Sequence, residues 1–539
     1  MVPLRMPWGG FRRSTSLVTR NGPAMIRIYN TLSREKEVFE PVHPGQVGIY
    51  LCGPTVYKPS HIGHMVGPVI FDAVKRYLSY CSYRVTLVIN ITDIDDKLIE
   101  ESRRRGIAVP EIAAEMTDDY MANLEVLGVD TVDHFPRCTD HIGDIIAMTA
   151  RLIEKGFAYE AGGDVYFEVS KAAGYGKLSH RGTEALQGDG GGMAERKRSL
   201  ADFALWKAAK PGEPSWQSPW GRGRPGWHIE CSAMSRALLG ETFDIHGGGL
   251  DLVFPHHENE LAQSESAHGK PFVKYWMHNG LMQDSGEVGK VGGRHTRPVE
   301  GDLESQQARK IAKSTGAQPF RQLLAENGFT GEQIRFFLLS THYRRPIDFS
   351  LQRVREVATG LEQFYRFFKR YERVCGESFY RLEAPARRAD GELDPSGQPL
   401  LEQVAEHRAR FLEAMDDDFN TGGAIGELFE LVRALNRFID RQRLEAPSRR
   451  QPEQLALLKR SAATLRELAG TLGLFRQPPE EPQAPTDQLV NQLVDLLVQL
   501  RTEARQAKNY ATADRIRDGL ARLGIALEDR PGGTEWSFK

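Results

Sequence analysis

The sequence lacks the features that mark secreted, membrane-spanning or nucleic-acid-coating proteins. Five cysteines in 539 residues are too few and too scattered for a disulfide framework, which favours a reducing cytoplasm and leaves metal binding or burial as their roles. No run of about 18 apolar residues occurs, which predicts no membrane span. Because 70 basic residues nearly balance 72 acidic ones, any nucleic-acid contact must come from local patches.

The composition that is present is typical of an ordinary globular protein, with 40% hydrophobic and 26% charged residues. At roughly three to four times a typical domain length, the chain should form several domains. Residues 1–24 are basic and lack acidic residues. We place them outside the folded protein, either as an organelle transit peptide or as the result of a start site assigned too early.

A βαβ unit is predicted near the amino-terminal end. The apolar run Val47 to Cys52 reads as a strand, Gly63 to Tyr80 has helical periodicity, and Arg84 to Ile89 is β-branched and strand-like. Such a unit predicts a parallel sheet, and hence an α/β fold. Polar residues after the two strands, 55–64 and 90–97, should meet at the carboxyl edge of that sheet, where open α/β folds bind ligands.

The later chain changes character twice. Residues from about 110 to 225 look inserted, with two helices, a hairpin over 157–169 and a glycine-rich loop, before a strand resumes at Phe243. From residue 351 the pattern is helical, with linkers near 383–398 and 477–486. We therefore predict an α/β domain at 25–350, a helical bundle at 351–475 and a small helical terminal part at 487–539.

The run His61-Ile62-Gly63-His64 follows the first predicted strand at the mouth of a predicted helix. A helix amino terminus offers free N–H groups and a positive dipole end, and two imidazoles beside a glycine add donors for a phosphate oxygen. Taken alone, two histidines three residues apart also fit an ordinary surface or core position.

A second group, His256 and Glu260, has helical i,i+4 spacing, so a nitrogen and a carboxylate oxygen can meet one ion. Zinc accepts His, Cys and carboxylate ligands together, and Cys52 and Cys231 could supply thiolates. The alternative is a polar helix start with two buried small side chains. A third group, Lys310 to Gly316, places two lysines and Ser314 where they could neutralise a polyphosphate, although such segments are usually solvated loops.

Together these groups resemble a known family. The HIGH run and the Lys310 to Ser314 loop resemble the two signatures of class I aminoacyl-tRNA synthetases. The chain more narrowly resembles the cysteinyl-tRNA synthetase family, from about residue 26 to the carboxyl end. The segments that carry this resemblance are LCGPTVY (51–57), NITDIDDK (90–97), GWHIECSAM (226–234), HGGGLDLVFPHHENE (246–260), YWMHNG (275–280) and AMDDDFNT (414–421).

The resemblance implies a Rossmann-like parallel-sheet domain with an inserted connective region, followed by an all-α tRNA-binding region. It implies activation of L-cysteine with ATP and Mg²⁺, then transfer of cysteine to the 3′ end of its tRNA. By carry-over, one Zn²⁺ would bind the substrate thiol and four protein ligands. These ligands are Cys52, Cys231, His256 and Glu260.

The same resemblance assigns roles to the remaining groups. His61 and His64 would stabilise the α-phosphate, Gly63 would leave room for adenine and ribose, and Lys310 and Lys313 would hold the leaving pyrophosphate. The weaker assignments place Thr55, Thr92 and Trp227 at the amino-acid pocket, Asp251 near the ribose, and arginines of the terminal part such as Arg501 on tRNA phosphates. A monomer is the family-based expectation, and the few scattered cysteines favour the cytoplasm.

The sequence departs from the family pattern in places. The lysine loop reads KIAKS where KMSKS is usual, the stretch from Gly280 to Lys310 is long, and Leu98 to Glu101 replaces a basic stretch. Two alternatives remain: a mycothiol-type cysteine ligase that acts on an amino sugar, and a non-catalytic RNA-binding paralogue. The long helical tail argues against the first, and the intact phosphate and zinc residues argue against the second.

Overall fold

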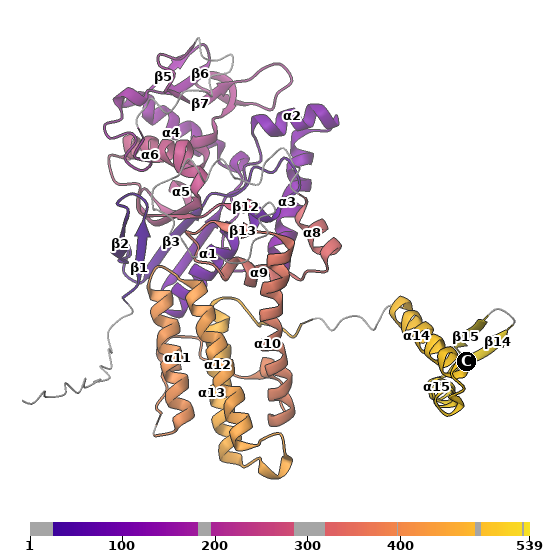
Figure 1. The fold of residues 1–539 in the computed structure, drawn as a ribbon. Coiled ribbons are helices and arrows are strands. Elements are labelled where there is room, and N and C mark those ends of the chain that lie inside the picture. Colours follow the sequence, from indigo (N-terminus) through magenta and orange to yellow (C-terminus); the bar gives the residue numbers. More distant parts are fainter. Residues whose placement is uncertain are drawn as a thin grey trace, which may run out of the picture. The chain divides into compact units, whose positions relative to one another are not determined.

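The computed structural model describes residues 25–181, 196–284, 318–395, 397–479, 487–530 and 533–538 (Figure 1). The chain divides into two compact units, Met1–Arg476 and Gln477–Lys539, and each is described by itself. No helix in the described part is long and apolar enough to cross a membrane.

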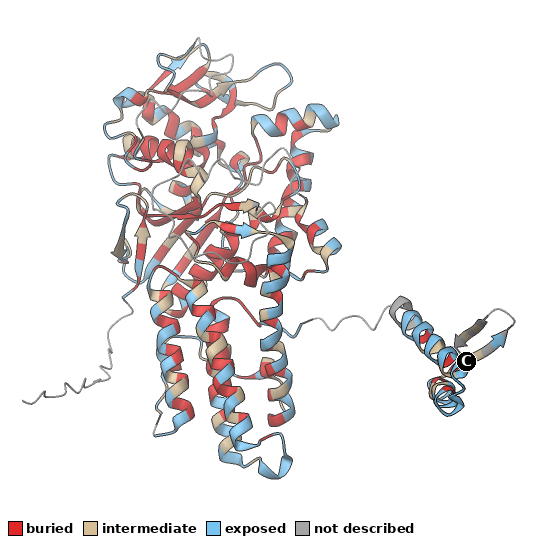
Figure 2. Cartoon of the chain, viewed as in Figure 1, coloured by how far each residue is buried: buried red, intermediate tan, exposed pale blue. Residues whose placement is uncertain are grey.

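A four-stranded parallel sheet forms the centre of the first unit, in the strand order β11-β10-β3-β4. Its strands are β3 (Gln46–Leu51), β4 (Arg84–Ile89), β10 (Phe243–Gly249) and β11 (Val273–Asn279). Helix α1 (Ile62–Tyr80) is the crossover between β3 and β4, because parallel neighbours need a long connection. The predicted parallel α/β fold is thus confirmed, and Figure 2 shows the sheet buried. The strand predicted to resume at Phe243 is β10, and it ends in the three glycines of 247–249.

Helices cover this sheet and fill the connections between its strands. They are α2 (Asp96–Arg105), α3 (Val109–Val126), α4 (Ile142–Glu154), α5 (Trp227–Leu239) and α6 (Glu258–His268). A hairpin of β1 (Arg27–Asn30) and β2 (Glu35–Val38) joins the sheet, with the N–H of Thr31 donating to the carbonyl of Trp276 at 2.9 Å. The two helices predicted for the inserted region occur as α3 and α4.

An antiparallel sheet lies between β4 and β10 in the sequence, in the strand order β5-β6-β7-β9-β8. Its strands are β5 (Ala158–Ala161), β6 (Asp164–Phe167), β7 (Phe203–Ala208), β8 (Trp216–Ser218) and β9 (Gly221–Pro225). The predicted hairpin turns at Gly162 and Gly163, whose φ angles of 64° and 86° suit glycine. The glycine-rich loop predicted over 182–193 lies outside the described residues.

The first unit ends in long helices. Strand β12 (Met282–Asp284) pairs in parallel with β13 (Ile347–Phe349) near α8 (Phe320–Asn327) and α9 (Gly331–Leu339). A helix bundle follows, made of α10 (Leu351–Cys375), α11 (Pro399–Asp416), α12 (Thr421–Gln442) and α13 (Pro452–Thr471). Apolar residues at three- and four-residue spacing bury one face of each helix, and Figure 2 shows the opposite faces exposed.

The second unit pairs α14 (Asp487–Gln506) and α15 (Tyr510–Arg522) with an antiparallel hairpin of β14 (Ile525–Arg530) and β15 (Gly533–Phe538). Val494, Leu520 and Ile525 form its small core. Arg501, a candidate phosphate contact in the sequence, is 7% exposed and pairs with Asp529 at 2.8 Å. Its guanidinium is therefore engaged within this unit. The domain boundaries placed inside the first unit stay predictions.

Candidate active site and metal centre

At the carboxyl edge of the parallel sheet, Cys52 is half-buried between neighbouring strand ends. Cys52 follows β3 directly, and its N–H donates to the carbonyl of Gly247 on β10 at 3.1 Å. The N–H of Gly53 donates to Oδ1 of Asn90, which follows β4, at 2.9 Å. A Cβ at residue 53 would lie 1.8 Å from the Asn90 carbonyl oxygen. Only glycine therefore allows this close approach of the two strand ends.

The four residues proposed as zinc ligands lie together at this edge, and we call them the ligand cluster: Cys52, Cys231, His256 and Glu260. One donor atom from each lies within 4.8 Å of all the others. The two sulfurs are 3.8 Å apart, and Sγ of Cys52 is 3.6 Å from Oε1 of Glu260. Ligands at 2.0–2.3 Å from a tetrahedral zinc ion lie about 3.3–3.8 Å from one another. The donor set thus fits zinc in both chemistry and spacing.

The local structure around His256 differs from the single helix that the i,i+4 spacing predicts. His256 lies in a π-helical turn (Val253–His257), and α6 begins only at Glu258. The i,i+4 spacing nevertheless brings the two side chains together, with His256 Nε2 3.0 Å from Glu260 Oε1. On the other side of its ring, His256 Nδ1 lies 2.9 Å from Nδ1 of His228. This second contact fixes the ring and leaves Nε2 directed at the cluster.

Sequence reasoning missed three buried histidines behind the ligand cluster. His246 Nε2 lies 2.9 Å from Glu260 Oε2, and His257 Nε2 lies 3.3 Å from Cys52 Sγ. His257 Nδ1 lies 2.8 Å from His278 Nε2. One donor atom from each of four residues likewise lies within 4.8 Å of the other three, and this second set consists of Cys52, His246, His257 and Glu260. The sequence signal that could have found them is their place in the family-like segments 246–260 and 275–280.

The electrostatics of the ligand cluster favour the deprotonated, metal-binding form at Cys231 and Glu260, but the protonated form at Cys52 and His256. Burial opposes ionisation of Cys231, but contacts with Cys52 and His256 outweigh it and lower the pKa of the Cys231 thiol to about 6. Burial also opposes the charged form of Glu260, yet His246 and His256 hold its pKa well below the usual range. At Cys52, burial and the neighbouring Cys231 both raise the pKa of the thiol well above its usual value.

The HIGH run lies at the amino terminus of α1, as predicted. His61 is the N-cap, and its Nδ1 accepts the N–H of Gly63 at 3.1 Å, while His64 Nδ1 accepts the N–H of His61 at 3.3 Å. The two rings stack with centroids 3.8 Å apart. A Cβ at Gly63 would lie 2.9 Å from His61 Cε1. Glycine therefore lets both imidazoles lie over the first helical turn, where the helix dipole is positive.

The predicted pocket residues lie near the same edge in different environments. Thr55 and Thr92 form a backbone bridge beyond the ends of β3 and β4. Trp227 is 40% exposed, and its ring stacks on His256 at 4.3 Å. Thr92 is only 2% exposed, and its hydroxyl donates to Glu230 Oε2 at 3.1 Å. Asp251 lies in a 3-10 helix (Leu250–Leu252) directly after β10.

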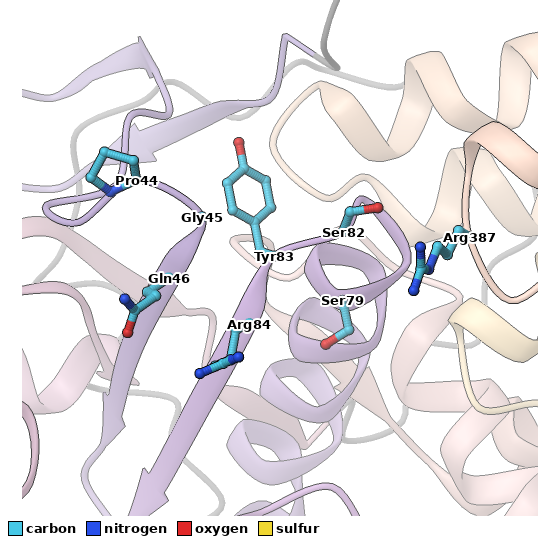
Figure 3. Close-up of a pocket in the computed structure, with 8 residues that line it drawn as sticks. All are labelled: Pro44, Gly45, Gln46, Ser79, Ser82, Tyr83, Arg84 and Arg387. Atoms are coloured by element: carbon cyan, nitrogen blue, oxygen red, sulfur yellow. The ribbon is translucent and has the colours of Figure 1, made fainter.

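Lys310 and Lys313 lie outside the described residues, so the structure does not place the lysine loop. The opposite, amino end of β3 and β4 carries a depression of about 560 Å³, lined by eight residues between Pro44 and Arg387 (Figure 3). It contains none of the predicted site residues.

Comparison with known proteins defines the class first. Residues 38–290 match the model for the class I (C) tRNA synthetase catalytic domain, residues 410–476 a DALR domain, and residues 491–536 a cysteinyl-tRNA ligase anticodon-binding domain. A methionyl-tRNA synthetase from Mycobacterium tuberculosis shares the fold, with a TM-score of 0.56 and 15% identity over 80% of this chain and 91% of that one. The chain thus has the class I aminoacyl-tRNA synthetase fold.

Full-length relatives then identify the family. A cysteine–tRNA ligase from Heliobacterium modesticaldum is 45% identical over 95% of this chain and 99% of its own length. One from Alkalilimnicola ehrlichii is 46% identical over the same shares. The chain belongs to the cysteine–tRNA ligase family. The match extends over the full length and includes the anticodon-binding domain, and it therefore argues against both alternatives, the amino-sugar ligase and the non-catalytic paralogue.

Proposed function

We propose that the ligand cluster holds one Zn²⁺ at which this chain, a ligase that joins L-cysteine to its tRNA, selects its amino acid. One observation carries the proposal: thiol, imidazole and carboxylate donors from three separate parts of the chain lie within 4.8 Å of one another in a buried site. Zinc takes this combination of ligands and can accept a further one from a substrate.

Cysteine and serine differ by sulfur for oxygen, and an apolar pocket separates such near-isosteres by only about 10- to 200-fold. A bound zinc ion would supply a soft Lewis acid that prefers the cysteine thiolate to a hydroxyl. Trp227, stacked on His256, and Thr55 would line the space beside the thiol. The four ligands would thereby provide the discrimination between the two amino acids.

Adenylate formation asks for positioning and charge stabilisation, because the cysteine carboxylate itself attacks the α-phosphorus of ATP. His61 and His64 over the first turn of α1 would stabilise the charge on the α-phosphate, and Gly63 would admit the nucleotide. Asp251 would approach the ribose. Lys310 and Lys313 would hold the leaving pyrophosphate, with Mg²⁺ accompanying ATP.

The tRNA would lie along the helical parts of the chain, with its 3′ end at the adenylate. The match of residues 491–536 to an anticodon-binding domain supports a tRNA substrate. We further propose that the chain acts as a monomer in the cytoplasm, the expectation that the family and the few scattered cysteines support.

Replacement of a single zinc ligand tests this proposal. In Cys231→Ser, bound zinc measured by atomic absorption should fall together with cysteine-dependent ATP–pyrophosphate exchange, by more than about 100-fold for the exchange. Cys375→Ser, at the end of α10 and outside the cluster, is the matched control and should keep both. Full zinc content and unchanged selection against serine in Cys231→Ser would refute the site.

A further inference from the structure

The segment Asn90–Lys97 follows β4, and its polar side chains hold neighbouring elements in place. Asp93 accepts the N–H of Thr139 at 3.0 Å, and Asp95 accepts the N–H of Lys97 to cap α2. Asp96 pairs with Lys207 on the antiparallel sheet at 2.6 Å. Side chains of residues 90–97 therefore connect several elements to the carboxyl end of β4.

Two residues of this segment, Asn90 and Thr92, form hydrogen bonds with residues that adjoin the ligand cluster in the sequence. Thr92 Oγ1 donates to Glu230 Oε2 at 3.1 Å and accepts from Asn90 Nδ2 at 3.3 Å, while Asn90 Oδ1 accepts the N–H of Gly53 at 2.9 Å. Asn90, Thr92 and Glu230 are each at most 2% exposed. Their hydrogen bonds thus form a continuous buried chain from α5 to the end of β3.

The two ends of this hydrogen-bonded chain adjoin two zinc ligands in the sequence. Gly53 follows Cys52, and Glu230 precedes Cys231. The two sulfurs belong to segments 179 residues apart and must stay 3.8 Å from each other. Backbone pairing between Thr92 and Pro54 holds the strand ends together, whereas the Thr92 hydroxyl is the group that reaches α5.

We propose that Thr92 and Glu230 are positioning residues that set the spacing of the Cys52 and Cys231 sulfurs for zinc. Thr92 then acts through Glu230 and Asn90, because its hydroxyl is already engaged on both sides by protein groups. Buried hydrogen bonds behind metal ligands commonly govern affinity in this way. The inference rests on the proposed zinc site.

Zinc affinity, measured by competition with a chromophoric chelator on the full chain, tests the inference. Thr92→Val keeps the shape but removes the hydroxyl, and we expect zinc binding to weaken by about 10- to 100-fold. Thr92→Ser keeps the hydroxyl and should stay within about threefold of the parent. The matched control is Thr149→Val, since the buried hydroxyl of Thr149 has no hydrogen-bond partner among the described residues. It should bind zinc as the parent does.

A double-mutant cycle separates the hydrogen bond from general packing. If Thr92 acts in part through Glu230, the loss of zinc affinity in the Thr92→Val/Glu230→Ala variant should be smaller than the sum of the two single losses. Parent-like affinity in Thr92→Val, equal losses in Thr92→Ser and Thr92→Val, or fully additive losses would each overturn the inference. If Cys231→Ser loses zinc while Thr92→Val does not, this inference fails alone; if Cys231→Ser keeps its zinc, the proposed site itself fails.

Discussion

The carboxyl edge of the sheet and the interior of the helix bundle both bury polar side chains, but they satisfy them differently. In the bundle, Arg408 and Glu467 form a buried ion pair at 2.8 Å, and the Tyr80 hydroxyl also donates to Glu467. At the sheet edge, the four residues of the ligand cluster converge on one point with atoms that all donate electron pairs. Burial of a polar group therefore does not by itself mark a functional site; converging ligand atoms do.

The largest effect should come from the catalytic side. Lys313→Ala should slow cysteine-dependent pyrophosphate exchange by about 10²- to 10³-fold, because it removes the cation proposed to stabilise the leaving phosphates. The KM for cysteine and the thermal midpoint should change little. Lys369→Ala, an exposed lysine on α10, is the control with parent-like kinetics. An unchanged exchange rate in Lys313→Ala would remove this lysine from the mechanism.

Removal of the buried ion pair between Arg408 and Glu467 in the bundle should lower stability and leave activity nearly unchanged. Arg408→Leu leaves the Glu467 carboxylate buried without its partner, so the free energy of unfolding should fall by about 3–5 kcal/mol. Pyrophosphate exchange at 25 °C should be near the parent value. Urea unfolding followed by circular dichroism gives the stability.

Arg433→Leu is the control for this change, since its pair with Glu430 is exposed and worth about 0–1 kcal/mol. If the free energy of unfolding fell equally in the two variants, burial of the pair between Arg408 and Glu467 would add nothing to its contribution to stability.

A smaller, pH-dependent effect is expected at His342, which precedes β13 and lies 3.5 Å from Asp418. Burial outweighs the Asp418 carboxylate and lowers the pKa of His342 to about 4. Below pH 6.5 the imidazole of His342 binds a proton in the unfolded chain but stays neutral in the folded chain. The free energy of unfolding therefore falls as the pH is lowered toward 4. Between pH 7 and 5 this amounts to about 1–2 kcal/mol.

Urea midpoints of the parent and of His342→Asn at the two pH values measure that contribution. The variant should lose less stability than the parent on acidification. An identical loss in both proteins would show that His342 does not contribute to the pH dependence.

The elements of the fold were largely predictable, because local apolar patterns determine them. Residues 84–89 were predicted as a strand with the bounds that β4 has, and the long helices of the bundle follow from amphipathic spacing. The strand predicted at 47–52 is shifted by one residue, to Gln46–Leu51. Cys52 therefore lies just beyond the strand, where its side chain can turn toward α5.

The site was less predictable, because its residues meet only through tertiary structure. Nothing local relates Cys52 to Cys231, and family motifs had to suggest the pairing that the order of β10 and β3 brings about. The histidines at 246, 257 and 278 and the carboxyl of Glu230 lie within the family-like segments, but those segments assigned them no role. They are recognisable only from the side chains that they contact.

The most direct test of the zinc-based selection is aminoacylation of a total tRNA pool with labelled cysteine and, in parallel, labelled serine. We expect the zinc-loaded protein to charge cysteine alone, to lose charging when a chelator removes the metal, and to regain it when zinc is restored. Selection of cysteine over serine that is equally strong in the zinc-free protein would contradict the account.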